Sequence, residues 1–68
     1  MRYELMERVD GRLQDGVFGA YSDVSDAVEE AKRIAADAGV VIDVFDHQTG
    51  LTIFRAHGTD WEWIKADA

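Results

Sequence analysis

Residues Asp23 to Gly39, DVSDAVEEAKRIAADAG, carry the clearest periodic pattern in the chain. Their apolar members recur at steps of three and four, which places them in one stripe along an α-helix. Asp23 can accept hydrogen bonds from the free amides of the first turn, and Gly39 allows the left-handed conformation that ends many helices. The stripe consists of Val24, Ala27, Val28, Ala31, Ile34, Ala35 and Ala38. The sequence therefore predicts one amphipathic helix whose apolar side must be buried.

Two short strands are expected before this helix. Tyr3 to Val9 alternates imperfectly between apolar and polar residues, as a half-buried strand does. The range 17–21, VFGAY, has the β-branched and aromatic residues of a second strand. Asp10-Gly11 is a turn dipeptide, but the polar residues after it leave open a longer connection up to Gly16. A first hairpin is expected, and its register stays open.

A second hairpin is expected after the helix. The range 40–46, VVIDVFD, has the strongest strand pattern in the chain. A loop that ends in Gly50 connects it to 51–56, LTIFRA, as an antiparallel partner. Trp61 and Trp63 then share one parity, which fits either a short fifth strand or a clamp over the sheet.

Alternation within the second hairpin sorts its apolar residues onto two faces. The aliphatic set is expected under the helix and comprises Ile42, Val44, Leu51 and Ile53. The aromatic set is expected on the opposite face and comprises Phe45 and Phe54, with Trp61 and Trp63 as candidates to join them. We therefore predict a single α+β domain over residues 1–68, with the order ββαββ and an antiparallel sheet of four or five strands under one helix.

Composition narrows the classes of partner. Seven Lys and Arg stand against fourteen Asp and Glu, a formal net charge of −7, and nucleic-acid sites that bind phosphates are cationic. We expect no direct nucleic-acid binding and a basic protein surface as partner, unless the acidity reflects a GC-rich or halophilic host. The first residues carry frequent charges and no apolar run, so neither a signal peptide nor a membrane span is expected. A cytoplasmic location is predicted.

Residues able to carry out catalysis are sparse. The chain has no cysteine, and the spacing of His47 and His57 matches no metal-ligand pattern. Ser22 and Ser25 lie where helix-capping hydroxyls belong. Glu29 is expected to form an i, i+4 ion pair with Arg33 on the outer helix face. We therefore predict no enzyme activity, no cofactor and no metal site.

The aromatic residues suggest a protein interface instead, with an acidic rim made of Asp43, Asp46, Asp60 and Glu62. Apolar anchors with a charged edge are the usual composition of such a surface. Alternatively, the tail folds back over this face or a homodimer buries it. The candidate partner-binding residues are Phe45, Phe54, Trp61, Trp63, Asp43 and Asp46 on the sheet, and Asp26, Glu29 and Glu30 on the helix.

One layout in the chain is similar to that of a known group of proteins. The run AKRIA at 31–35 late in the helix is followed by a strand, a turn closed by Gly50, a second strand, and Gly58 shortly before Trp61. This layout, which covers residues 23–63, resembles certain small phage-encoded anti-CRISPR proteins. In those proteins a single helix packs on an antiparallel sheet in chains of similar length.

The resemblance implies a binding protein that sits on a CRISPR-Cas surveillance complex and blocks access to target DNA. Asp26, Glu29 and Glu30, or the acidic rim of the sheet, could then occupy basic channels that hold a phosphate backbone. Lys32 and Arg33 interrupt the helical carboxylates, so steric blocking through the aromatic face is the other route. The functional hypothesis is an inhibitor of a nucleic-acid-binding complex. The alternative is a cytoplasmic housekeeping domain, either monomeric or homodimeric, whose acidity only reflects its host.

Overall fold

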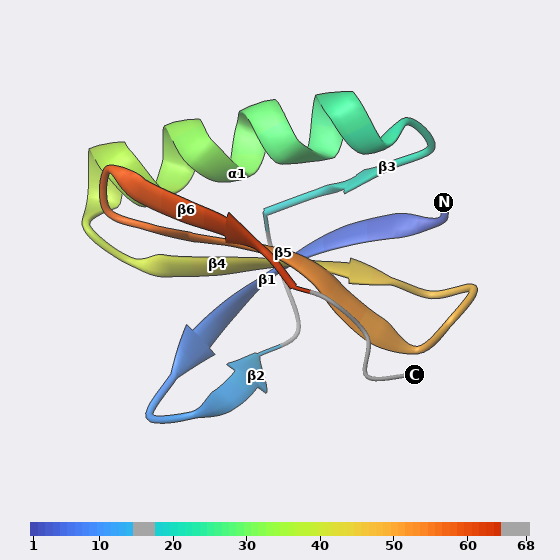
Figure 1. Cartoon of the computed structure of the whole chain (residues 1–68), viewed down its shortest axis with the longest axis horizontal. Helices are drawn as coiled ribbons and strands as arrows, with labels where there is room; N and C mark the ends of the chain where they lie inside the picture. The colour runs from blue at the N-terminus through green and yellow to red at the C-terminus, as the bar shows by residue number, and fades with distance from the viewer. Residues whose placement is uncertain (15–17, 65–68) are drawn as a thin grey trace.

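The computed structural model describes residues 1–14 and 18–64 and has one helix packed on one antiparallel sheet (Figure 1). The strands run in the order β2-β1-β4-β5-β6, and β3 pairs with the first two residues of β1. The predicted α+β fold is confirmed, with six strands rather than four or five. The elements are β1 (Tyr3–Val9), β2 (Arg12–Gln14), β3 (Ala20–Tyr21), α1 (Val24–Ala38), β4 (Val41–Asp46), β5 (Leu51–His57) and β6 (Asp60–Trp63).

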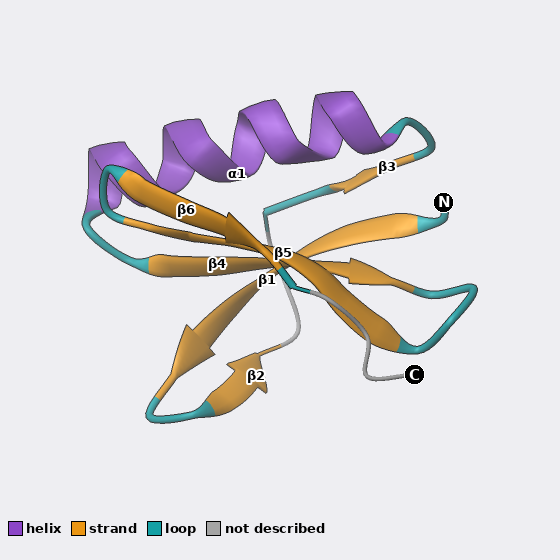
Figure 2. Cartoon of the chain, viewed as in Figure 1, coloured by secondary structure: helices purple, strands orange, loops and turns teal. Residues whose placement is uncertain are grey.

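Helix α1 begins and ends where the sequence predicts. The Asp23 carboxylate accepts a hydrogen bond of 2.8 Å from the Ser25 amide, and Gly39 adopts the left-handed conformation with φ 67°. Its buried residues, Ala27, Val28, Ala31 and Ala35, are small. The helix therefore lies close against one face of the sheet as a separate layer (Figure 2).

The core lies between α1 and the centre of the sheet. Ile42 and Val44 on β4 are fully buried beneath the helix, as predicted, and Leu5 on β1 lies opposite Val44. On β5, however, the buried residues are Phe54 and Ala56. Leu51, which was expected in the core, is 47% exposed, and Ile53 is only partly buried.

A β-bulge explains this difference. Phe45 pairs with Thr52, but Val44 pairs with Phe54, so β5 advances two residues where β4 advances one. An unbulged hairpin would set Ile53 opposite Val44 and Phe54 opposite Asp43. The extra residue, Ile53, moves Phe54 to the helix side of the sheet. The predicted placement of Phe54 on the opposite face is wrong for this reason.

The first hairpin closes at Asp10-Gly11, the shorter of the two connections that the sequence allowed. Asp10 and Gly11 both have positive φ, 52° and 79°, as the two central residues of a type I′ turn require, and Val9 pairs with Arg12. The predicted second strand, 17–21, is reduced to Ala20–Tyr21, and Val17 lies outside the described residues. Two short strands, β2 and β3, thus share one side of β1, which accounts for the larger strand count.

Candidate protein interface at strand β6

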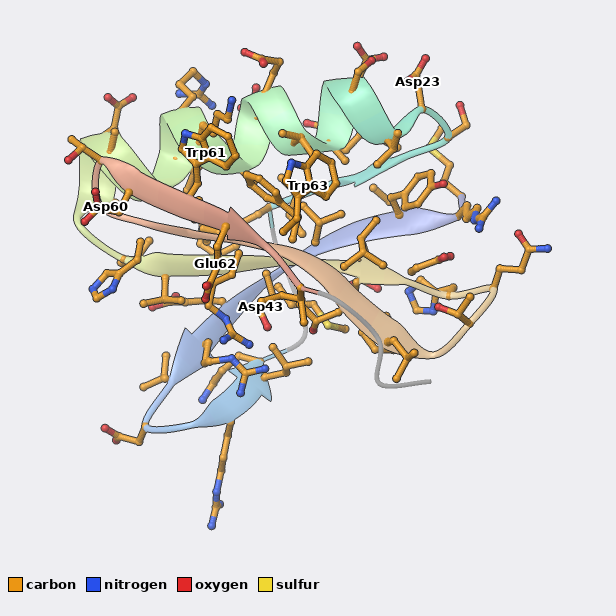
Figure 3. The ribbon with its side chains drawn as sticks, in the orientation of Figure 1. Asp23, Asp43, Asp60, Trp61, Glu62 and Trp63 are labelled. Carbon is orange, nitrogen blue, oxygen red and sulfur yellow. The ribbon has the colours of Figure 1, made fainter. Side chains whose placement is uncertain are left out.

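The two tryptophans lie on the helix side of the sheet, next to α1. Trp61 pairs with Ala56 and Trp63 with Phe54, and both β5 residues belong to the core under the helix. In Figure 3 both indoles rise from β6 toward α1, whereas Glu62 between them points the other way. Trp61 is 51% exposed and Trp63 is 55% exposed. The shared parity was predicted and is confirmed, and of the two alternatives, a short strand or a clamp, the structure has the strand. The suggestion that both tryptophans join Phe45 on the face opposite the helix is wrong.

Aromatic contacts hold these indoles in place. Phe54 is fully buried, and its ring stacks on Trp61 with centroids 5.7 Å apart and meets Trp63 edge-on at 4.9 Å. Lys32 on α1 places its ammonium 4.5 Å from the centre of the Trp61 ring, within cation–π range. We call Trp61, Trp63 and Lys32 the tryptophan surface. Its two indoles are half exposed yet anchored to the core through Phe54.

A shallow hollow flanks β6 on each face of the sheet. On the helix side a hollow of about 290 Å³ is lined by Lys32, Ala36, Gly58, Thr59, Asp60 and Trp61. On the other side a hollow of about 210 Å³ is lined by Arg55, His57, Asp60, Trp61 and Glu62. Residues 60–62 therefore contribute to concave surface on both sides of the strand.

The backbone of β6 also faces outward. Among residues 1–14 and 18–64, no strand pairs with the side of β6 away from β5. Antiparallel partners alternate between pairs that exchange two hydrogen bonds and pairs that exchange none. The Ile64 amide donates to the Ile53 carbonyl at 2.9 Å, so these two residues form a hydrogen-bonded pair. Because such pairs recur at every second residue, Glu62 forms a hydrogen-bonded pair with Arg55. The N–H and C=O groups of Trp61 and Trp63 consequently point away from β5, and we call this side the β6 edge.

Asp43 does not belong to an exposed acidic rim. It is fully buried on the face opposite the helix, and its carboxylate accepts hydrogen bonds from Arg8 at 2.7 Å, Arg55 at 2.8 Å and Thr52 at 3.0 Å. Burial acts to raise the pKa of Asp43, but the bonds from Arg55 and Arg8 outweigh it and hold that pKa below its ordinary value. The expectation of Asp43 on the interface rim is wrong, because arginines from both neighbouring strands enclose it.

Asp46 is likewise enclosed at the other end of β4. The residue is 3% exposed, and its carboxylate accepts two hydrogen bonds from Arg2, at 2.9 and 3.0 Å, and one from the Gln48 amide at 3.0 Å. The Arg2 hydrogen bonds lower the pKa of Asp46 to about 2. The rim placement is wrong here too, because the carboxylate holds the N-terminal segment against the β4–β5 turn.

Phe45 is separated from the other predicted anchors. It lies half-buried on the face opposite α1, where its ring meets the His47 imidazole edge-on with centroids 5.0 Å apart. His47 in turn contacts the Glu4 carboxylate at 2.7 Å. Because the bulge divides the four aromatics, Phe54, Trp61 and Trp63 gather on one side of the sheet and Phe45 on the other.

The helix carboxylates are partly engaged by neighbouring cations. Glu30 pairs with Arg33, which lowers the pKa of Glu30, and Arg33 also contacts Asp37 at 3.3 Å. Glu29 lies 3.8 Å from Lys32, so the predicted pair of Glu29 with Arg33 is wrong. Asp26 is exposed in the first turn. These helix residues lie on an outer surface separate from the tryptophan surface, apart from the link through Lys32.

Sequence reasoning missed three contributors to this architecture: Arg8, Arg55 and Lys32. Arg8 and Arg55 lie on the two strands that flank β4, and once the bulge is known Arg55 falls opposite Asp43. An aspartate in the middle of a largely apolar strand was the available signal, since buried charges need partners. Lys32 could be found only by knowing which face carries Trp61.

The described part of the chain contains no group of three or more His, Cys, Asp or Glu side chains placed to hold a metal ion. Nor is any described helix long and apolar enough to cross a membrane. No model of a known protein family matches the chain, and no curated protein or solved structure shows significant similarity to it.

Proposed function

We propose that this chain is a protein-interaction domain that contacts its partner through the tryptophan surface. The observation that carries the proposal is the exposure of two adjacent indoles, 51% and 55%, on a strand whose outer edge is unpaired within the described chain. Tryptophan is the residue most enriched among energetically dominant interface positions. A pair already held by Phe54 would lose little side-chain entropy on binding.

The same observation supports one mode of action over another. Inhibition of a nucleic-acid-binding complex would proceed by steric contact through the tryptophan surface rather than by imitation of a phosphate backbone. Glu30 is paired with Arg33, while Asp43 and Asp46 are enclosed by arginines, so these carboxylates form no exposed row. The net charge of −7 still favours a basic partner surface through long-range steering.

The test is affinity capture of the tagged full chain from host lysate, with and without nuclease. Trp61→Ala and Trp63→Ala remove the proposed anchors, and Leu51→Ala is the matched control, because Leu51 is a comparably exposed apolar residue beyond the end of β6 pairing. We expect a stoichiometric partner that the control retains and the tryptophan variants lose. Circular dichroism must show that all three variants are folded.

Nuclease treatment helps to distinguish the inhibitor hypothesis from the housekeeping alternative. A nuclease-resistant complex with a DNA- or RNA-handling assembly would support the inhibitor hypothesis. A partner retained equally by the tryptophan variants would refute the tryptophan surface as the contact. Elution of the chain alone, or as a dimer by sedimentation, would favour the housekeeping alternative instead.

A further inference from the structure

The β6 edge offers backbone groups in the arrangement that a further strand requires. Trp61 and Trp63 direct their N–H and C=O groups away from β5, which gives two donors and two acceptors in one row. Extended peptides bind exposed sheet edges through such groups, and side chains on alternate positions supply the specificity. The chemistry on the two faces of β6 therefore indicates which sequence would fit.

The face opposite the helix favours a basic side chain. Asp60 and Glu62 share that face and line the 210 Å³ hollow together with Arg55 and His57. The Arg55 guanidinium is already committed to the Asp43 carboxylate, at 2.8 and 3.2 Å. No described cation lies within ion-pair distance of Asp60 or Glu62 in this structure. A lysine or arginine of an added strand would face both carboxylates at this point.

The helix-side face favours an apolar side chain. At alternate positions the added strand would face the indoles of Trp61 and Trp63. The cation–π position over Trp61 is already occupied by Lys32. Aliphatic or aromatic side chains would extend the cluster that Phe54 begins, so the preferred segment alternates basic and apolar residues.

Two symmetric pairings of this edge with a second copy of the chain would bring like charges together. Symmetric antiparallel pairing centred on Glu62 would set Glu62 opposite its own copy. Pairing centred on Trp61 would set Asp60 opposite Glu62. Like charges directly opposite each other in an antiparallel pair are destabilising. The same carboxylates that disfavour self-pairing favour a basic partner.

We propose that the β6 edge accepts an extended segment of a basic partner protein as an additional strand. Its Lys or Arg side chains face Asp60 and Glu62, and its apolar side chains pack on Trp61 and Trp63. This inference rests on the proposed function, since it names the kind of partner that the tryptophan surface would bind.

The test is a titration of the isotopically labelled full chain followed by NMR. The probe is a capped heptapeptide of alternating lysine and valine, KVKVKVK. One control, KKKKVVV, keeps its composition and charge but not its alternation, and a second, EVEVEVE, reverses the charge. We expect saturable shifts at the Trp61 and Trp63 amide and indole signals with the alternating basic peptide. Affinity for the block peptide should be about tenfold weaker, and the acidic peptide should produce no shifts.

Two sets of variants distinguish hydrogen bonding of the peptide to the β6 backbone from nonspecific attraction between the peptide and the protein. Trp63→Pro and Trp63→Ala both remove the indole, but only proline removes the outward N–H, which an edge position tolerates. We expect the proline variant to bind the peptide more weakly than the alanine variant. The double variant Asp60→Asn, Glu62→Gln should lose the preference for lysine over glutamate peptides while the protein keeps its native spectrum.

Several results would overturn the proposal: equal affinity for the alternating and block peptides, shifts confined to the acidic surface of α1, or equal binding by the proline and alanine variants. Concentration-dependent shifts of β6 without peptide would assign the edge to a second copy. If the tryptophan variants lose the captured partner but the peptides fail, the proposed function stands and strand addition is wrong. If the variants keep the partner while the alternating peptide binds, the tryptophan surface is not the cellular contact.

Discussion

Trp61 stacks on Phe54 with an angle of 28° between their rings, so a half-exposed side chain is held by a fully buried one. This contact ties the tryptophan surface to the core under α1. The order of the indoles should therefore depend on a residue that no partner could touch.

Replacing Phe54 by leucine tests this dependence. Leucine keeps the site apolar but removes the ring on which both indoles rest, so we expect a loss of roughly 1 to 1.5 kcal/mol in the free energy of unfolding. The near-UV circular dichroism of the tryptophans should weaken as well. Phe45→Leu is the control, because Phe45 lies on the opposite face and its replacement should leave the tryptophan signal unchanged. An unaltered signal in Phe54→Leu would show that the indoles are held by other contacts.

Asp43 is expected to be the most sensitive charged position among those that the structure describes. Asp43→Asn leaves two arginine side chains facing a neutral amide in a dehydrated site, and breaking a buried ion pair in this way costs roughly 3 to 5 kcal/mol. Urea unfolding at neutral pH measures the loss. Asp37→Asn, at an exposed helix position, should change stability little. A similar, small effect of both substitutions would contradict the structural role of the Asp43 cluster.

Acid should destabilise the fold through Asp46 in a defined pH window. The pKa of an aspartate in an unfolded chain is about 3.9. The folded-state pKa of Asp46 is about 2, so between these values the unfolded chain binds a proton that the folded chain does not. Its contribution is therefore fully present above about pH 4 and is lost as the pH falls toward 2. Asp43, whose pKa is also lowered, acts in the same direction.

Arg2→Gln checks the source of that pH dependence. Without the guanidinium the folded-state pKa of Asp46 should return toward its ordinary value, because the Arg2 hydrogen bonds are the main cause of the shift. Urea midpoints measured between about pH 5 and about pH 2.5 should then fall less steeply than in the wild type. An unchanged slope would assign the acid sensitivity to other carboxylates.

Gly39 offers a test of backbone conformation without a steric complication. Its φ is 67°, and a Cβ added there would meet nothing within 4 Å, so Gly39→Ala should cost only the left-handed strain, roughly 1 kcal/mol. Gly39→Asn should cost less, since asparagine tolerates this region better. Thermal unfolding followed by circular dichroism measures both. Equal stability of the alanine variant and the wild type would contradict the assigned helix cap.

The parts of the fold that depend on local chemistry could be predicted from the sequence. The helix follows from its apolar period and from Asp23 and Gly39 at its ends, and Tyr3–Val9 follows from alternation alone. The shared side of Trp61 and Trp63 is a property of any strand through them. These features need no knowledge of distant contacts.

The parts that depend on strand register could not be predicted. The bulge at Ile53 leaves no mark on the sequence, since an apolar residue there suits either a regular or a bulged strand. Without it, Phe54 and Arg55 exchange faces, so the expected aromatic face and the expected exposure of Asp43 both follow from that error. The enclosure of Asp43 needs arginines 35 and 12 residues away, a pairing that only the assembled sheet provides.

The bulge at Ile53 also bears on how such a surface could change in evolution. While Ile53 is present, the side of the sheet taken by each later residue, including those of β6, depends on this one residue, which has no partner on β4. Loss of the Ile53 codon would make Thr52 and Phe54 neighbours in a regular ladder, with Phe54 still opposite Val44, so the tryptophans would stay on the side of α1. Two otherwise near-identical chains that differ by this deletion would thus present the same indoles to their partners, so a one-residue gap at this point would be no sign of a change in binding.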